Sequence, residues 1–119
     1  MSNLGKRRKL IMVYIYALIF SFSGFALAEP MHEAAKEGDL AKVKSLIAEG
    51  SDVNVKDENG LTPLNIAATE GYKDVVEQLI SNGANVGAVD NTDATPLHLA
   101  VREGHKEIAE LLFKHGGSK

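Results

Sequence analysis

One hexapeptide recurs at a fixed spacing and constrains this chain more than any other feature of its sequence. The stretch from Thr95 to Ala100 is TPLHLA, and a near copy, TPLNIA, begins at Thr62. A degenerate third copy, EPMHEA, begins at Glu29, the same step before the second copy as the second is before the first. This step also relates two sets of glycines, namely Gly38, Gly71 and Gly104, and Gly50, Gly83 and Gly116. Independent registers that agree on one period indicate a repeat array.

Each hexapeptide also carries the signals that begin a helix. The hydroxyl of Thr62 or Thr95 can accept a hydrogen bond from a free backbone N–H of the first turn, and a proline follows at the first helical position. Further along each unit, Gly71 or Gly104 can adopt the left-handed backbone that ends many helices. Each unit is therefore predicted to begin with a helix of about two turns.

A second helix is predicted in each unit from apolar residues at helical spacing. These residues are Leu40, Val43, Leu46 and Ile47; Val75, Val76, Leu79 and Ile80; and Ile108, Ala109, Leu111, Leu112 and Phe113. In the first unit, Lys42 and Lys44 take the places that Val75 and Glu77 have in the second. Because terminal units of repeat arrays have a polar outer face, the first unit is predicted to be the N-terminal cap.

With these motifs, the chain resembles the ankyrin-repeat family. The family pattern, roughly G-x-T-P-L-H-L-A-A-x-x-G-H, is matched from Gly60 to Tyr72 and from Thr95 to His105, and its G-A-D-V-N element is matched at 50–54 and 83–87. The resemblance covers Pro30 to Gly116. It implies an all-α solenoid of three helix-turn-helix units, about residues 29–61, 62–94 and 95–119, with short β-hairpin loops.

Three positions depart from the family pattern. Asn65 replaces the usual His, Gly87 replaces Asn, and Asp93 replaces Gly in the second loop. The Asn65 amide can still bond backbone across the unit, and Asp tolerates a left-handed backbone better than most residues. The resemblance therefore determines the geometry of the second loop less well than that of the first.

Residues 1–28 are not part of the array. Basic residues 6–9 precede an apolar run from Leu10 to Phe20, and Ala26-Leu27-Ala28 follows. This order is typical of a secretory signal peptide, with cleavage expected after Ala28, and it predicts a periplasmic or secreted protein. The alternative is an uncleaved helix that anchors the protein in a membrane, although the serines and glycine at 21–24 disfavour it.

Removal of residues 1–28 changes the charge of the protein. Four of the thirteen Lys and Arg residues leave with the signal, so nine remain against sixteen Asp and Glu, a net charge of −7. Such a surface disfavours nucleic acid as a partner. Residues 29–119 have a length that suits one domain, and the chain has no cysteine for disulfides or thiolate metal sites.

The sequence contains no recognisable catalytic, cofactor-binding or metal-binding motif. His32-Glu33 begins an H-E-x-x-H pattern, but Lys36 stands where the second zinc ligand would be. A calcium loop counted from Asp52 fails as well, with Lys56 at its fifth position. His32, His98 and His105 are interpreted as structural. We therefore expect a protein that is not an enzyme and that carries no cofactor or metal.

Binding of a protein partner is the remaining expectation, and the resemblance implies where it occurs. Ankyrin proteins bind through a concave surface made by their loop tips and the exposed ends of the first helices. Leu61 and Val89 are the expected apolar anchors. Carried over by position, the predicted docking face consists of Lys36, Glu37, Lys56, Glu58, Asn59, Leu61, Thr69, Glu70, Val89, Asn91, Thr92, Ala94, Arg102 and Glu103.

Two alternatives remain open from the sequence. The apolar last helix, with Phe113, could instead make a homodimer, because exposed apolar patches often mark an interaction. An uncleaved N-terminal segment would make the protein a membrane-anchored adaptor. The sequence does not identify the partner.

Overall fold

The computed structural model describes residues 30–116 and contains, within them, six helices and no β-strand. The predicted signal peptide, residues 1–28, and its alternative as a membrane anchor lie outside the described residues. The helices are α2 (Pro30–Glu37), α3 (Leu40–Ala48), α4 (Pro63–Glu70), α5 (Lys73–Ser81), α6 (Pro96–Arg102) and α7 (Lys106–Lys114). The predicted all-α fold is confirmed.

The threonine and proline of the repeated hexapeptide begin helices, as predicted. Thr62 caps α4 by accepting the backbone N–H of Asn65, and Thr95 caps α6 by accepting that of His98. In both helices the side chain at the third helical position also accepts the backbone N–H of the threonine, which completes a capping box. Backbone donors at these two helix starts are thereby satisfied within the hexapeptide itself.

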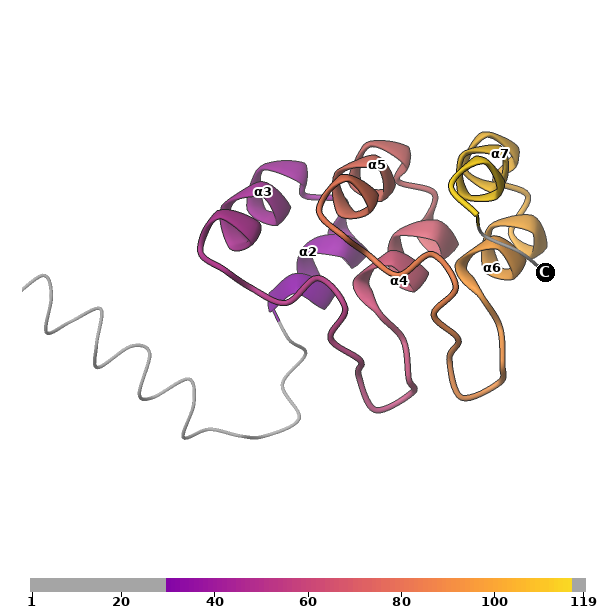
Figure 1. The fold of residues 1–119 in the computed structure, drawn as a ribbon, viewed down its shortest axis with the longest axis horizontal. Helices are drawn as coiled ribbons and strands as arrows, with labels where there is room; N and C mark the ends of the chain where they lie inside the picture. Colours follow the sequence, from indigo (N-terminus) through magenta and orange to yellow (C-terminus); the bar gives the residue numbers. More distant parts are fainter. Residues whose placement is uncertain (1–29, 117–119) are drawn as a thin grey trace, which may run out of the picture.

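The six helices stack as three antiparallel pairs (Figure 1). Helices α2, α4 and α6 lie in one row, helices α3, α5 and α7 lie in a second row, and neighbouring helices of each row are in contact. The core runs through the stack, where the leucines Leu64 and Leu79 of the middle pair are almost completely buried. The middle pair is therefore covered on both sides, as an internal unit of a solenoid should be.

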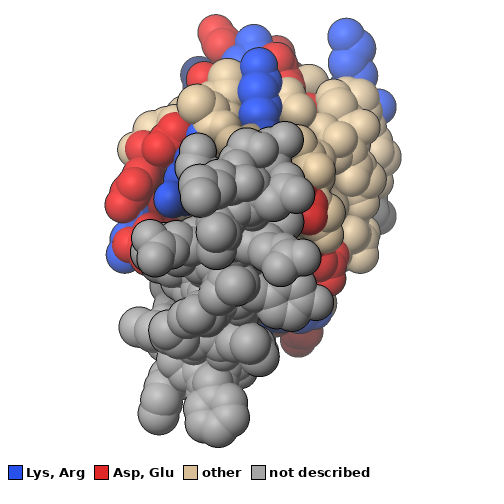
Figure 2. All heavy atoms as spheres, turned by 90° about the vertical axis from the view of Figure 1, so that its left-hand side faces the viewer, with Lys and Arg blue, Asp and Glu red and all other residues tan. Residues whose placement is uncertain are grey.

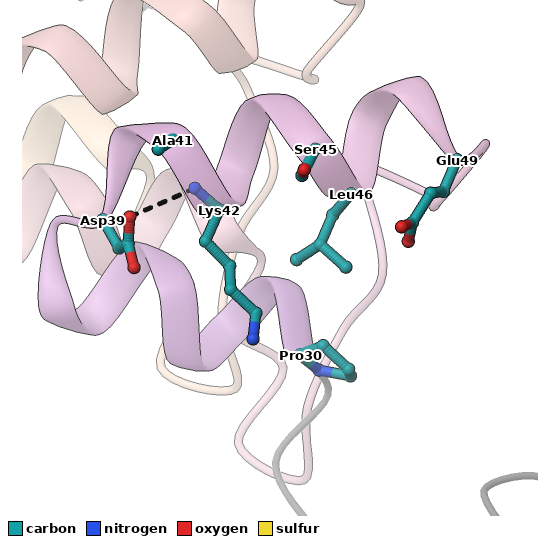
Figure 3. Close-up of a pocket in the computed structure, with 7 residues that line it drawn as sticks. All are labelled: Pro30, Asp39, Ala41, Lys42, Ser45, Leu46 and Glu49. Atoms are coloured by element: carbon teal, nitrogen blue, oxygen red, sulfur yellow. Dashed lines mark hydrogen bonds between the residues drawn. The ribbon is translucent and has the colours of Figure 1, made fainter. Parts of the chain in front are cut away.

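The first pair has the polar outer side that the sequence predicts for a cap. Lys42 is exposed, whereas Val75 and Ile108, at the equivalent places of α5 and α7, are buried. Figure 3 shows Lys42 extending from α3 across a shallow hollow toward α2, with Ser45 and Glu49 further along α3. Figure 2 looks at this end of the molecule and shows charged side chains of both signs.

Hydrogen bonds from one repeated position link the first and second helix pairs to the backbone ahead of them. His32 Nε2 lies 2.8 Å from the carbonyl of Leu61 and donates to it, since a carbonyl can only accept. Asn65 Nδ2 donates to the carbonyl of Ala88 at 3.1 Å. Asn65 therefore donates to a carbonyl of the loop that precedes the next pair, as His32 does, although the two acceptors are not at equivalent repeat positions.

A second hydrogen bond joins the C-terminal end of α4 to the turn between α6 and α7. His105 Nε2 donates to the carbonyl of Thr69, 3.0 Å away, and its ring packs against Gly71. Gly71 has a positive φ of 88°, and a Cβ there would come within 2.6 Å of the imidazole. Glycine is thus required at this place both for its backbone conformation and for the close approach of the ring.

The loops between the pairs turn back on themselves without forming strands. The backbone N–H of Asp57 donates to the carbonyl of Leu61 at 2.9 Å, and Asp90 donates to Ala94 in the same way at 3.0 Å. No residue between 30 and 116 is in a β-strand, so the predicted β-hairpin strands are not confirmed. The turns themselves are present and project beyond α4 and α6 (Figure 1).

Replacement of Asn65 tests the link between the second and third pairs. In Asn65→Ala the buried carbonyl of Ala88 and the backbone N–H of Thr62 lose their partners, and unfolding should become easier by about 1–3 kcal/mol. His98→Ala is the matched control, because His98 occupies the same repeat position but is exposed. Urea unfolding followed by circular dichroism measures both variants. Equal losses of stability would contradict the importance of the cross-unit bond.

Candidate protein-docking surface

The predicted docking face is distributed over three helix ends and two loops. Lys36 and Glu37 lie at the end of α2, Thr69 and Glu70 at the end of α4, and Arg102 and Glu103 at the end of α6. The other members are in the loop that precedes α4 or the loop that precedes α6. The stacking of the pairs places these segments next to one another although each is a full repeat away from the next in the sequence.

Aspartates at equivalent positions shape the two loops. The Asp57 carboxylate accepts the backbone N–H groups of Asn59 and Leu61, both at 2.9 Å. The Asp90 carboxylate accepts those of Thr92 at 2.7 Å and Ala94 at 3.1 Å. Each carboxylate thus accepts two backbone N–H groups that a neighbouring strand would accept in a sheet. These bonds hold the turns without a sheet.

This role of Asp57 and Asp90 is not among the sequence-based predictions. These two aspartates are one repeat step apart, and Gly60 and Asp93 follow them at equal distances, which is the signal that could have predicted it. Asp93 has a φ of 62° and Gly60 a φ of 77°, so Asp93 adopts the left-handed backbone that the family pattern assigns to glycine. The second loop, whose geometry the family pattern determined less well, therefore has the same turn as the first.

The two loops are also bonded to each other. The backbone N–H of Asn91 donates to the carbonyl of Asn59 at 3.0 Å, and its Nδ2 donates to the carbonyl of Glu58 at 3.1 Å. Lys56 Nζ donates to the carbonyl of Val89 at 3.2 Å. These bonds fix the loop tips relative to one another, so a partner that contacts both would not have to order them.

Not every member of the predicted docking face has its polar group available. The side chains of Asn91, Lys56 and Thr69 donate to backbone carbonyls within the protein. The Thr92 hydroxyl donates to the Asp90 carboxylate at 2.6 Å. These four residues stabilise the face, whereas the exposed side chains of Glu58, Asn59 and Glu70 make no hydrogen bond with other described residues and are accessible to a partner.

The two expected apolar anchors differ in exposure. Val89 lies in the second loop and is 36% exposed, which makes it one of the exposed large apolar residues of the described chain. Leu61 is half-buried beside Thr62, and its carbonyl already accepts His32. Val89 is therefore the more accessible anchor, and Leu61 contributes a smaller apolar area.

The described residues offer little for chemistry. Residues 30–116 contain no group of three or more His, Asp or Glu side chains placed to hold a metal ion. The hollow at the N-terminal end, of about 650 Å³, is open and lined by Pro30 and residues of α3 and its cap. A smaller hollow of about 210 Å³ lies between the start of α7 and Gly71. Neither hollow borders a loop tip of the docking face.

One buried polar atom has no partner among the described residues. His32 is 3% exposed, and its Nδ1 makes no hydrogen bond within residues 30–116. The equivalent acceptors are Asn65 Oδ1 and His98 Nδ1, and each takes the backbone N–H of the residue three places earlier. For His32 that residue is Glu29, which is outside the described range. The lack of a partner for His32 Nδ1 among the described residues therefore does not indicate a ligand.

None of the helices from α2 to α7 has the length and apolar character that crossing a membrane requires. Only the described residues bear on this finding, and the N-terminal apolar run is not among them.

The pH dependence of stability tests the role of Asp90. The hydrogen bond from the Thr92 hydroxyl is the main cause that lowers the pKa of Asp90; the backbone bonds and Arg102 add to it, and desolvation opposes it. A carboxyl whose folded pKa is lowered stabilises the fold fully above its unfolded pKa, and this stabilisation is lost as the pH falls through the folded value.

We expect Asp90→Asn to be less stable than the unmodified protein in urea at pH 7. The difference should shrink in acid, because the carboxyl of the unmodified protein becomes protonated as the pH falls through the lowered pKa of Asp90. Asp93→Asn removes the same charge from the same loop and serves as the control, with little change at either pH. A gap between Asp90→Asn and the unmodified protein that stays constant with pH would refute the assignment.

Comparison with known proteins agrees with the repeated geometry. The family model for ankyrin repeats in three copies matches residues 31–119. An ARF GTPase-activating protein, Git, from Drosophila melanogaster is 47% identical over 38 residues, which are 32% of this chain and 5% of that protein. The matched segment is thus a small part of the Drosophila protein. Three stacked helix pairs that begin with the TPLH-type motif, together with the match across the array, show that this chain belongs to the ankyrin-repeat family.

Proposed function

We propose that this protein is an exported, non-enzymatic binding module that holds a partner protein on its docking face. Ankyrin repeats indicate a protein–protein interaction module. We also propose that the partner contacts the loop tips and the ends of the first helices, and that this occurs in the periplasm or outside the cell. The observation that carries it is the bonding of the two loops to each other through Asn91.

Loops that are already ordered lower the free-energy cost of binding a partner. Mobile loops lose conformational freedom when a partner orders them, and this loss subtracts from the affinity. Here the Asp57 and Asp90 turns and the Asn91 bonds already hold the tips in place. A surface that is ordered in advance and still exposes Val89 and unbonded polar side chains is suited to a partner protein.

The size and charge of the face limit the partner. Three basic and four acidic residues are interspersed on the face, so a partner with charges of both signs fits it better than a strongly charged one. Three helix pairs offer a modest footprint, at the small end of the roughly 1,200–2,000 Å² that specific complexes bury. We expect a few residues around Val89 to carry most of the binding energy.

Export is proposed from the N-terminal sequence. Basic residues 6–9, the apolar run that follows and the Ala-Leu-Ala that ends at Ala28 together resemble a cleavable signal. The alternative function, a membrane-anchored adaptor, requires the same segment to stay attached. In both cases the binding face is the same, and only the location of the protein differs.

Docking can be tested by affinity capture from the exported fraction of the source cells. We expect Val89→Asp to reduce capture of the partner at least tenfold and Leu61→Asp to reduce it as well, because a charge would be desolvated in the contact. Ser81→Asp is the matched control, since Ser81 is exposed at the end of α5 and is not part of the docking face. Capture that is unchanged in Val89→Asp but lost in Ser81→Asp would place the interaction on the row of α3, α5 and α7.

Export can be tested by determining the N-terminus of the protein that cells accumulate. Cleavage after Ala28 predicts a soluble species beginning at Glu29, identified by N-terminal sequencing and intact mass. Replacement of Ala26 and Ala28 by larger residues should block processing. A full-length species that stays with the membrane in the unmodified protein would instead support the anchored adaptor.

A further inference from the structure

The outward side of the last helix pair differs in exposure from the same side of the middle pair. We call this side the C-terminal face and define it by His98, Val101 and Phe113. The repeat step relates Val101 to Ala68, and Val101 is 63% exposed whereas Ala68 is fully buried. Phe113 is 71% exposed, although Ile80 at the equivalent place is half-buried. Within residues 30–116 no helix packs on this side of α6 and α7.

His98 shows the same difference in its hydrogen bonds. Its Nδ1 accepts the backbone N–H of Thr95, so in the neutral ring the proton is on Nε2. In the two earlier pairs the equivalent side chain donates forward, from His32 to Leu61 and from Asn65 to Ala88. His98 Nε2 has no such acceptor among the described residues. The face therefore combines large apolar side chains with an available donor.

The charge of this end indicates what can cover it. Residues 95–116 contain three basic side chains, Arg102, Lys106 and Lys114, and three acidic ones, Glu103, Glu107 and Glu110. Residues 30–94 contain five basic and twelve acidic side chains. When a surface meets its own copy, any net charge on it is repeated on the other side and repels. The last helix pair is neutral with histidines uncharged, so it can meet a second copy without that repulsion, unlike the acidic remainder.

The other end of the stack excludes an open chain of copies. In head-to-tail packing the C-terminal face would cover the N-terminal end of the next molecule, where Lys42 and Ser45 replace the buried Val75 and the half-buried Gln78 of the middle pair. Burial of the Lys42 ammonium group against Val101 and Phe113 would cost free energy without a paired charge. A contact between two identical C-terminal faces avoids this cost.

We propose that two copies of this chain associate through their C-terminal faces about a twofold axis. Val101 and Phe113 of each copy are buried against α6 and α7 of the other, and the mixed charges at the rim pair across the axis. The contact covers the side of α6 and α7 whose equivalent in α4 and α5 is covered by the next pair. The two loops of each copy, with Val89, lie outside the contact, so the pair would present two partner sites.

Sedimentation velocity on the full chain, in the form that the cell accumulates, tests the association over a range of concentrations. The unmodified protein should shift from monomer to dimer, and Val101→Lys and Phe113→Lys should each raise the dissociation constant at least tenfold. Lysine suits both sites in the monomer, since each is near a helix C-terminus. Ser45→Lys, which adds the same charge at the N-terminal end, is the control and should dimerise as the unmodified protein does.

Cysteine cross-linking gives a second readout that does not depend on weakening the contact. The chain has no cysteine, so Val101→Cys introduces a single thiol at the C-terminal face. Oxidation should convert this variant to a covalent dimer, whereas Ser45→Cys should stay largely monomeric. Circular dichroism verifies that each variant has the helical content of the unmodified protein.

Three results would overturn the proposal. The first is an unmodified protein that stays monomeric up to about 1 mM. The second is a dimer that both lysine variants at the C-terminal face leave intact, which would place the contact elsewhere. The third is association abolished by Ser45→Lys or continuing to larger assemblies, which would indicate head-to-tail packing. None of these results affects the docking face, because Val89 is in a loop and is not part of the proposed contact.

Discussion

The packing of each helix pair on the next is the interaction on which this protein depends. A pair of helices of seven to nine residues is too short to be stable alone, since short isolated helices are marginal in water. Leu64 and Leu79 become buried only because pairs lie on both sides of them. His32 and Asn65 then reinforce the stack by donating to the backbone of the loop that leads into the following pair. Stability is therefore shared among neighbours.

This dependence explains why the two ends of the stack differ. The first pair needs no neighbour on its outer side, because Lys42 stands there in place of the buried Val75 and Ser45 in place of the half-buried Gln78. The last pair retains large apolar residues, Val101 and Phe113, on a side where no described element covers them. The same repeated positions thus act as core in the middle of the array and as an exposed surface at its end.

The stack also supplies the rigid support for the loops. Asp57 and Asp90 form equivalent turns from local residues, but the bonds of Asn91 to Glu58 and Asn59 exist only when two units stand side by side. The docking face is accordingly a property of the array and of no single unit. Some of its members, such as Lys56, hold the loops, and others, such as Glu58, face outward.

The sequence by itself determined the period, the helix starts and the polar first pair. Thr62 and Thr95 were identifiable as caps because capping involves residues close together in the chain. The resemblance implied hairpin strands in the loops, which the structure does not confirm; there the carboxylates of Asp57 and Asp90 accept backbone N–H groups. Only the tertiary structure decided which predicted docking residues are free and that Asn65, like His32, donates to the loop before the next pair. Those outcomes depend on contacts between atoms of different repeats, and no local pattern specifies such distances.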